Sequence, residues 1–376
     1  MNGSLQKKGN MWYAVISLEG GKQKWISTKT KDKNKAKVVL RDILTKMDND
    51  SYIDPTKIKF LDFMNDWLDN EVSKNIEKTT LESYMLTYKS HIKPYFEKLN
   101  LSLSDLKALH LQKYINYKHE KGRADGKGGL GGNTLRKHKI LIKSCLNYAV
   151  KMRLITYNPI ENVSLPKKEK FTGSYYNAEQ IEKLLEIVKN TPIETPVILA
   201  VFYGFRRGEV LGLKWDDVDF TEGTIAVNNT RVRYSKVSVD KCPKTEKSRR
   251  TLPLINVVAS YLKKLKLKQS SNKIAMGKDY HDSKYVCSWD NGQLYSVSFV
   301  NHKLTKLLSD YKMPHIRFHD LRHSTASYLL KQGFSLKEIQ EWLGHADIST
   351  TANIYSHIDL EMKKNIANRL DTRFAM

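Results

Sequence analysis

The sequence of 376 residues predicts a multidomain, mainly helical protein with small β elements. A short β-rich stretch followed by helical composition fills residues 1–50, and an all-helical pattern covers residues 55–160. Helices and short strands then alternate over residues 174–376, which predicts an α+β domain. A chain of this length can hold two or three domains with their own cores. We therefore predict three domains over these ranges, with a linker at residues 161–173.

The first fifty residues predict strands and then a helix. Trp12–Leu18 is rich in strand-forming residues and ends at a glycine pair, and Gln23–Thr28 follows as its hairpin partner. Thr30–Lys46 has apolar residues at three- and four-residue spacing, which is typical of one helix face. The segment is therefore expected to form a small sheet with one helix.

Residues 55–160 predict four helices with aromatic and aliphatic stripes turned inward and basic residues left outside. The first expected helix begins after Pro55, and the second runs from near Thr79 until Pro94 stops it. The third and fourth cover Leu109–Lys121 and Asn133–Lys151. A glycine-rich loop precedes the fourth helix. Because Leu165-Pro166 and a charged run follow this module, residues 161–173 are interpreted as a solvated linker or a basic strap.

The charge of the chain indicates a polyanionic partner. Its formal net charge is +24, from 64 Lys+Arg against 40 Asp+Glu, and the excess is spread along the whole chain. Charge alone also leaves open a merely soluble basic protein.

The cysteines and the apolar runs of the sequence indicate the cellular compartment of the protein. Cys145, Cys242 and Cys287 are odd in number and far apart, so their spacing predicts neither a disulfide framework nor a zinc site. Reduced thiols fit a reducing cytoplasm. The first residues have no apolar stretch typical of a signal peptide, and the apolar run Thr195–Phe205 is too short to span a bilayer. We expect a soluble cytoplasmic protein with no membrane partner.

Six residues in the last part of the chain suit the attack of a hydroxyl on a phosphodiester without a metal. They are Arg206, Lys244, His319, Arg322, His345 and Tyr355. Arginines can neutralise the charge that builds on the non-bridging oxygens, lysine and histidine can carry protons, and the tyrosine can attack. Glu209 is three residues past Arg206, where it can support the guanidinium.

The order and neighbours of these residues resemble the tyrosine recombinases, in particular the integrases of phages and integrative elements. The strings that carry the resemblance are GFRRGE at 204–209, PKT at 243–245, HDLRH at 319–323, LGH at 343–345 and NIYSH at 353–357. By this resemblance the catalytic arginine is Arg206 and not Arg207. The lysine is Lys244, with Lys247 as the alternative. The six-residue pattern shows no departure from that of the family.

The resemblance implies a domain order. The first fifty residues would be an arm-type DNA-binding domain with a three-stranded sheet, residues 55–160 a SAM-like core-binding domain, and residues 174–376 the catalytic domain. A C-terminal helix after Asp359, with Met362, Ile366 and Leu370 on one face, would pack on its own domain or on a neighbouring protomer.

The resemblance also implies an activity and partners. Tyr355 would cleave DNA through a 3′-phosphotyrosine, and strand exchange would pass through a Holliday junction without ATP, metal or other cofactor. The partners would be double-stranded attachment sites of core and arm type, three further copies of the chain in a tetramer on DNA, an excisionase and a host DNA-bending protein. The complex would act at the bacterial nucleoid and would integrate and excise a phage or a conjugative transposon.

The same residues allow three alternative interpretations. His315, His319 and His323 are spaced four residues apart, as metal ligands on a helix can be, but no carboxylate joins them and Arg322 would repel a cation. A type IB topoisomerase would share the chemistry, although its size and domain order fit poorly. A DNA-binding regulator that no longer cleaves would not need the intact set of six residues.

Overall fold

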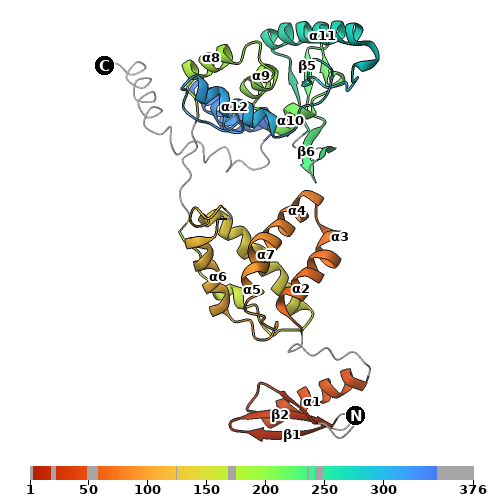
Figure 1. Ribbon diagram of the computed structural model, residues 1–376, viewed down its shortest axis with the longest axis vertical. Helices are drawn as coiled ribbons and strands as arrows, with labels where there is room; N and C mark the ends of the chain where they lie inside the picture. The colour runs from red at the N-terminus through yellow and green to blue at the C-terminus, as the bar shows by residue number, and fades with distance from the viewer. Residues whose placement is uncertain are drawn as a thin grey trace, which may run out of the picture. The chain divides into compact units, whose positions relative to one another are not determined.

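The computed structural model describes residues 3–17, 23–48, 58–123, 125–167, 175–234, 237–241 and 249–344 (Figure 1). The chain forms two compact units, Met1–Glu169 and Lys170–Met376. Lys244, Lys247, His345, Tyr355 and the segment after Asp359 lie outside the described residues. The division of the first unit into an arm-type and a core-binding domain stays a prediction.

The first unit begins with a three-stranded antiparallel sheet and one helix. The strands β1 (Gly3–Lys8), β2 (Met11–Ser17) and β3 (Gln23–Ser27) pair in the order β1-β2-β3, and α1 (Lys33–Asp48) follows. A small core lies between the sheet and α1, around Ala14, Ile16 and Ile43. The three-stranded sheet is thus confirmed. The residues of β1 are largely polar, so its sequence alone gave no strand signal.

The helical part of the first unit contains two helices interrupted by a π-helical turn and two uninterrupted ones. Its elements are α2 (Phe60–Trp67), η1 (Leu68–Val72), α3 (Ser73–Asn75), α4 (Lys78–Thr87), η2 (Tyr88–Ile92), α5 (Lys93–Phe96), α6 (Ala108–Lys121), α7 (Gly132–Lys151) and the 3₁₀ turn η3 (Pro159–Asn162). The predicted aromatic stripes form its buried core.

Pro94 does not end the second of these helices, contrary to the sequence-based expectation. The π turn η2 precedes it, and Pro94 occupies the first turn of α5, which runs on to Phe96. A proline lacks the N–H that a continuing α-helix would need, but the first turn of a new helix leaves that position without an intrahelical acceptor. The wider turn therefore lets the chain stay helical through the proline.

A cluster of titratable side chains is buried between α6 and α7. The Tyr114 hydroxyl and His138 Nδ1 are 2.9 Å apart, and the rings of His91 and His138 are 5.0 Å apart between centroids. Lys118 is also buried. Burial, followed by the effects of His91 and Lys118, lowers the pKa of His138 to about 4. The folded protein therefore keeps this imidazole neutral.

This cluster should make the helical part acid-sensitive. In the unfolded chain the imidazole titrates near its ordinary pKa of 6.5, so between pH 6.5 and 4 the unfolded state binds more protons than the folded state. The free energy of unfolding should therefore fall as the pH is lowered through this window, by roughly 2–3 kcal/mol. Hydrogen exchange of α6 and α7 amides in the intact chain measures this loss. His138→Gln should flatten the dependence, and an unchanged dependence would contradict the assignment to His138.

The second unit joins helices to two small sheets. Its helices are α8 (Ala178–Ile187), α9 (Glu194–Tyr203), α10 (Arg207–Gly212), α11 (Asn256–Met276), α12 (Phe299–Asp310), α13 (Asp320–Lys331) and α14 (Leu336–Leu343), with 3₁₀ turns η4 (Trp215–Asp217) and η6 (Gly277–Asp279). Its strands are β4 (Val218–Asp219), β5 (Thr224–Ala226), β6 (Thr230–Tyr234), β7 (Val237–Lys241) and β8 (Thr251–Pro253). The sheets have the orders β4-β5-β8 and β6-β7. The predicted α+β architecture is confirmed.

The sequence from Arg231 to Val239 predicts a single strand, but the structure divides it between the two strands of a hairpin. Strands β6 and β7 pair antiparallel, with Thr230 opposite Lys241 and Tyr234 opposite Val237. The segment between the two strands contains no glycine or proline, so its composition resembles one continuous strand. The residue expected to be catalytic, Lys244, therefore follows the second strand of this hairpin in the sequence.

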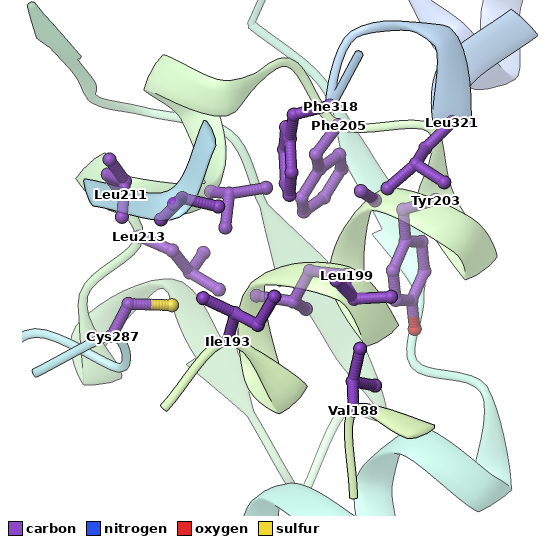
Figure 2. Close-up of a cluster of buried hydrophobic side chains, with 14 of the residues drawn as sticks. Val188, Ile193, Leu199, Tyr203, Phe205, Leu211, Leu213, Cys287, Phe318 and Leu321 are labelled. Carbon is purple, nitrogen blue, oxygen red and sulfur yellow. The ribbon is translucent and has the colours of Figure 1, made fainter. Parts of the chain in front are cut away.

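The larger of two apolar clusters in the second unit fixes the residues beside the site. Phe205 precedes Arg206 and Phe318 precedes His319, and both phenyl rings lie in this buried cluster (Figure 2). The Tyr203 and Phe205 rings stack at 5.1 Å between centroids. Within the described ranges, no helix is long and apolar enough to cross a membrane.

Candidate active site

The position of Arg206 follows from a helix break. Gly204 ends α9 in the left-handed conformation, with a φ of 61°, and Arg206 then caps the N-terminus of α10. A Cβ at Gly204 would lie 2.2 Å from Leu343 Cδ2, so a larger residue there would strain the backbone and push the Leu343 side chain aside. The Arg206 side chain is 35% exposed. The break therefore presents a guanidinium at the surface from a rigid corner.

Glu209 holds the backbone and the side chain of Arg206 at once. Its Oε2 accepts from the Arg206 backbone N–H at 3.0 Å, and its Oε1 accepts from Arg206 Nη1 at 2.6 Å. The Glu209 side chain is 3% exposed. Burial disfavours its ionised form, but Arg250 and Arg206 outweigh burial and hold the pKa of this carboxyl below its usual value. The expected support of Arg206 by Glu209 is thus present as two direct contacts.

A second arginine, Arg250, shares the same carboxylate. Its Nη2 donates to Glu209 Oε2 at 3.0 Å, and its Nε donates to the Trp342 carbonyl at 3.1 Å. Its guanidinium lies 5.1 Å from the centroid of the Phe205 ring, a cation–π contact. Arg206 Nη2 in turn donates to the Gly344 carbonyl at 3.0 Å. The carboxyl end of α14 is therefore attached to both arginines.

Arg322 is buried in the first turn of α13, with 1% of its surface exposed. Its Nη1 donates to the Gly204 carbonyl at 2.7 Å, which joins α13 to the corner that carries Arg206. Thr325 strengthens this join, because its Oγ1 donates to the Val201 carbonyl of α9 at 2.8 Å. The structure thus brings the two predicted arginines to the same break between α9 and α10. Arg206 belongs to this break, and Arg322 donates to the Gly204 carbonyl within it.

His319 lies directly before α13 and next to His323, with 5.3 Å between ring centroids. Desolvation lowers the pKa of His319 to about 4, and the neighbouring His323, Arg322 and Arg206 act in the same direction. Part of the residue is open to solvent, where a substrate could reach it. At neutral pH the imidazole is therefore uncharged and able to accept a proton.

The three histidines of the alternative metal interpretation do not form a metal-binding cluster in the described part of the chain. Among the described residues, no three histidine, cysteine or carboxylate side chains come together in a geometry that could hold an ion. His323 and Asp320 instead belong to the first turn of α13, and Arg317 donates to both oxygens of Asp320.

The chain is similar to known proteins over most of its length. The profile of the phage integrase family matches residues 175–362, and that of the phage integrase N-terminal SAM-like domain matches residues 59–119. The chain belongs to the phage integrase family of tyrosine recombinases. A XerC-like tyrosine recombinase of Caldanaerobacter subterraneus is 28% identical over 98% of both chains.

Two solved structures share the fold of this phage integrase family member. The Tn1549 transposon integrase, in complex with transposon right end DNA, has a TM-score of 0.67 and 18% identity, and the match covers 85% of this chain and all of that one. A lambda integrase tetramer bound to a Holliday junction has a TM-score of 0.60 and 17% identity, and the match covers 93% of this chain and 94% of that one.

The described part of the site holds three of the six residues predicted for this integrase family member. Arg206, His319 and Arg322 come together from α9–α10 and α13, and the end of α14 joins them. Sequence reasoning missed Arg250, which contacts Glu209. Its only signal is its position just before β8, in a run of two arginines, where nothing distinguishes it from an exposed basic residue.

Proposed function

We propose that this protein is a site-specific recombinase that integrates and excises a mobile element, a phage or a conjugative transposon. It would cleave and rejoin double-stranded DNA at attachment sites. The observation that carries the proposal is the convergence of Arg206, Arg322 and the neutral His319 at one corner, from which α14 leads into the segment with His345 and Tyr355.

The proposed reaction is the one that the family resemblance implies, and the charges of the described groups suit it. Tyr355 attacks a DNA phosphate and forms a 3′-phosphotyrosine while the 5′-oxygen leaves. Arg206 and Arg322 stabilise the charge on the non-bridging oxygens, with His345 as a further hydrogen-bond donor to the phosphate. His319 accepts the tyrosine proton, and Lys244 delivers a proton to the leaving oxygen. Because the phosphotyrosine conserves the bond energy, neither ATP nor a metal ion is required.

The proposed assembly is a tetramer that joins two duplexes and passes through a Holliday junction. The 5′-hydroxyl of one duplex attacks the phosphotyrosine of the other, first for one pair of strands and then for the other pair. An excisionase and a host DNA-bending protein would set the direction of the reaction. The shared fold with a lambda integrase tetramer on a Holliday junction supports this assembly.

Trapping on a nicked duplex tests the proposal. The core duplex is taken from the junctions between the element that carries the gene and the flanking chromosome, and a nick beside the scissile phosphate lets the leaving strand diffuse away. A recombinase should accumulate a covalent complex that survives denaturant, on this sequence and with a chelator present. Adducts on many unrelated sequences, with plasmid relaxation, would indicate a topoisomerase. A complex that never becomes covalent would indicate a regulator.

We further propose that the first fifty residues bind arm-type sites through the free face of their sheet. Side chains alternate along a strand, so those opposite the core point away from α1. Trp25 is 47% exposed there, and its ring lies 6.3 Å from that of Tyr13 across β2 and β3. A twisted face of aromatic and polar side chains with nearby lysines fits a DNA groove.

Removal of this sheet should separate core cleavage from full recombination. A fragment that starts at residue 55 is expected to trap the covalent complex on the core duplex at the rate of the intact chain, within a few-fold. It should lose binding to flanking arm sequences, measured by footprinting, and should recombine full attachment sites far less efficiently. Equal recombination by the fragment and the intact chain would mean that the sheet does not bind arm sites.

A further inference from the structure

We propose that Arg250 is a positioning residue of the cleavage reaction. It fixes the orientation of Arg206 and offsets the negative charge of the Glu209 carboxylate that the two arginines share. This role rests on the proposed recombinase function. It concerns a side chain that need not touch DNA, because Arg250 is only 7% exposed.

The hydrogen bonds of Glu209 connect Arg250 to Arg206. Its Oε2 accepts from both the Arg206 backbone N–H and Arg250 Nη2, each at 3.0 Å, while Oε1 accepts from Arg206 Nη1. The Arg250 contact therefore fixes the plane of the carboxylate, and that plane fixes the direction of the Arg206 guanidinium. Without Arg250, the carboxylate could rotate and take Arg206 with it.

The charges around Glu209 do not cancel. Three guanidiniums, those of Arg206, Arg250 and Arg322, act on this one ionised carboxylate, so the cluster carries two net positive charges, and without Arg250 one would remain. The cluster is largely buried, so these charges are weakly screened by water. Arg250 therefore adds to the positive charge that the cluster presents toward a phosphate.

Arg250 also joins three chain segments that carry predicted catalytic residues. It follows the segment of Lys244, contacts Glu209 beside Arg206, and donates to the Trp342 carbonyl near the end of α14. A Cβ at Gly344 would lie 2.8 Å from Arg250 Nη1, so this guanidinium packs against the turn immediately before His345. A lysine has one terminal nitrogen and cannot reproduce this planar bridge.

The test compares Arg250→Met with Arg249→Met, which removes the same charge from the exposed neighbouring position. Single-turnover cleavage of the nicked core duplex is measured at saturating protein, with DNA affinity and thermal unfolding measured separately. Arg250→Met is expected to cleave about 10- to 100-fold more slowly, with DNA affinity close to that of Arg249→Met. Loss of the buried ion pair is expected to lower its melting temperature, so cleavage is compared at a temperature at which both variants are folded. Arg250→Lys should restore little of the rate.

A second substrate distinguishes positioning from general support of the fold. A methylphosphonate at the scissile position removes the negative charge that Arg206 neutralises. If Arg250 acts through Arg206, the rate ratio of wild type to Arg250→Met should shrink on this duplex. An equal ratio on both duplexes would assign Arg250 a structural role and overturn the proposal.

The remaining outcomes are also decisive. Arg250→Met cleaving as fast as Arg249→Met, while the wild type forms its adduct, refutes the positioning role and leaves the recombinase function intact. A wild type that forms no adduct refutes both. If Arg250→Met does not fold, Arg250→Lys retains the charge and gives the same comparison on the two duplexes.

Discussion

Tyr355→Phe is expected to abolish the covalent protein–DNA complex and to leave DNA binding nearly unchanged. The substitution removes one hydroxyl, which is the proposed nucleophile, and keeps the ring. Neither water nor the arginines can replace the hydroxyl in a reaction that must end in a protein-bound phosphate. Denaturing electrophoresis after incubation with the nicked core duplex measures the adduct, and a mobility shift measures binding.

Tyr328 provides the matched control for this change. It is another tyrosine of the second unit, 43% exposed on α13 and without an assigned role in the reaction. Tyr328→Phe should trap the complex at the wild-type rate. If Tyr355→Phe still formed an adduct resistant to denaturant, another residue would be the nucleophile and the interpretation of the C-terminal segment would be wrong.

Arg206→Ala is expected to slow cleavage by roughly 10²-fold or more, the usual scale for losing a donor that stabilises developing charge. The substitution also leaves Glu209 with one guanidinium partner in place of two. The local positive charge would then be reduced by one unit where the phosphate is expected. Single-turnover cleavage at saturating protein measures this loss apart from any change in DNA affinity.

Arg207→Ala is the control, because it deletes the adjacent arginine in the first turn of α10. Arg207 makes none of the hydrogen bonds to Glu209 that define the Arg206 corner, so its loss should change the cleavage rate only a few-fold. A larger effect at Arg207 than at Arg206 would exchange the roles that the resemblance assigned to the two residues.

Much of the fold could be predicted because its elements have strong local signals. The Asn177–Gln180 capping box starts α8, and the Ser335–Glu338 box starts α14, as their sequences indicate. The errors lie where tertiary structure decides. A π turn lets Pro94 continue a helix, and the antiparallel pairing of β6 with β7 divides a segment whose composition resembles one strand.

The site was predictable in its residue types but not in its connections. Characteristic neighbours identified Arg206, His319 and Arg322, and a spacing of three residues suggested Glu209. Arg250 is 41 residues from Glu209 in the sequence, and its contact depends on how β8 approaches α10. No local pattern encodes a contact of that range. The roles of Lys244, His345 and Tyr355 stay predictions that the variants above can test.

The carboxylate shared by two arginines also constrains how this chain can change over generations. A substitution at Glu209 would leave the guanidiniums of Arg206 and the buried Arg250 without their shared counter-charge, and one at Arg250 would leave the carboxylate with one arginine partner in place of two. Either change alone is unfavourable, so drift at one position should be tolerated only when the other changes as well. In related sequences, residues 209 and 250 should therefore vary together, although they are far apart along the chain.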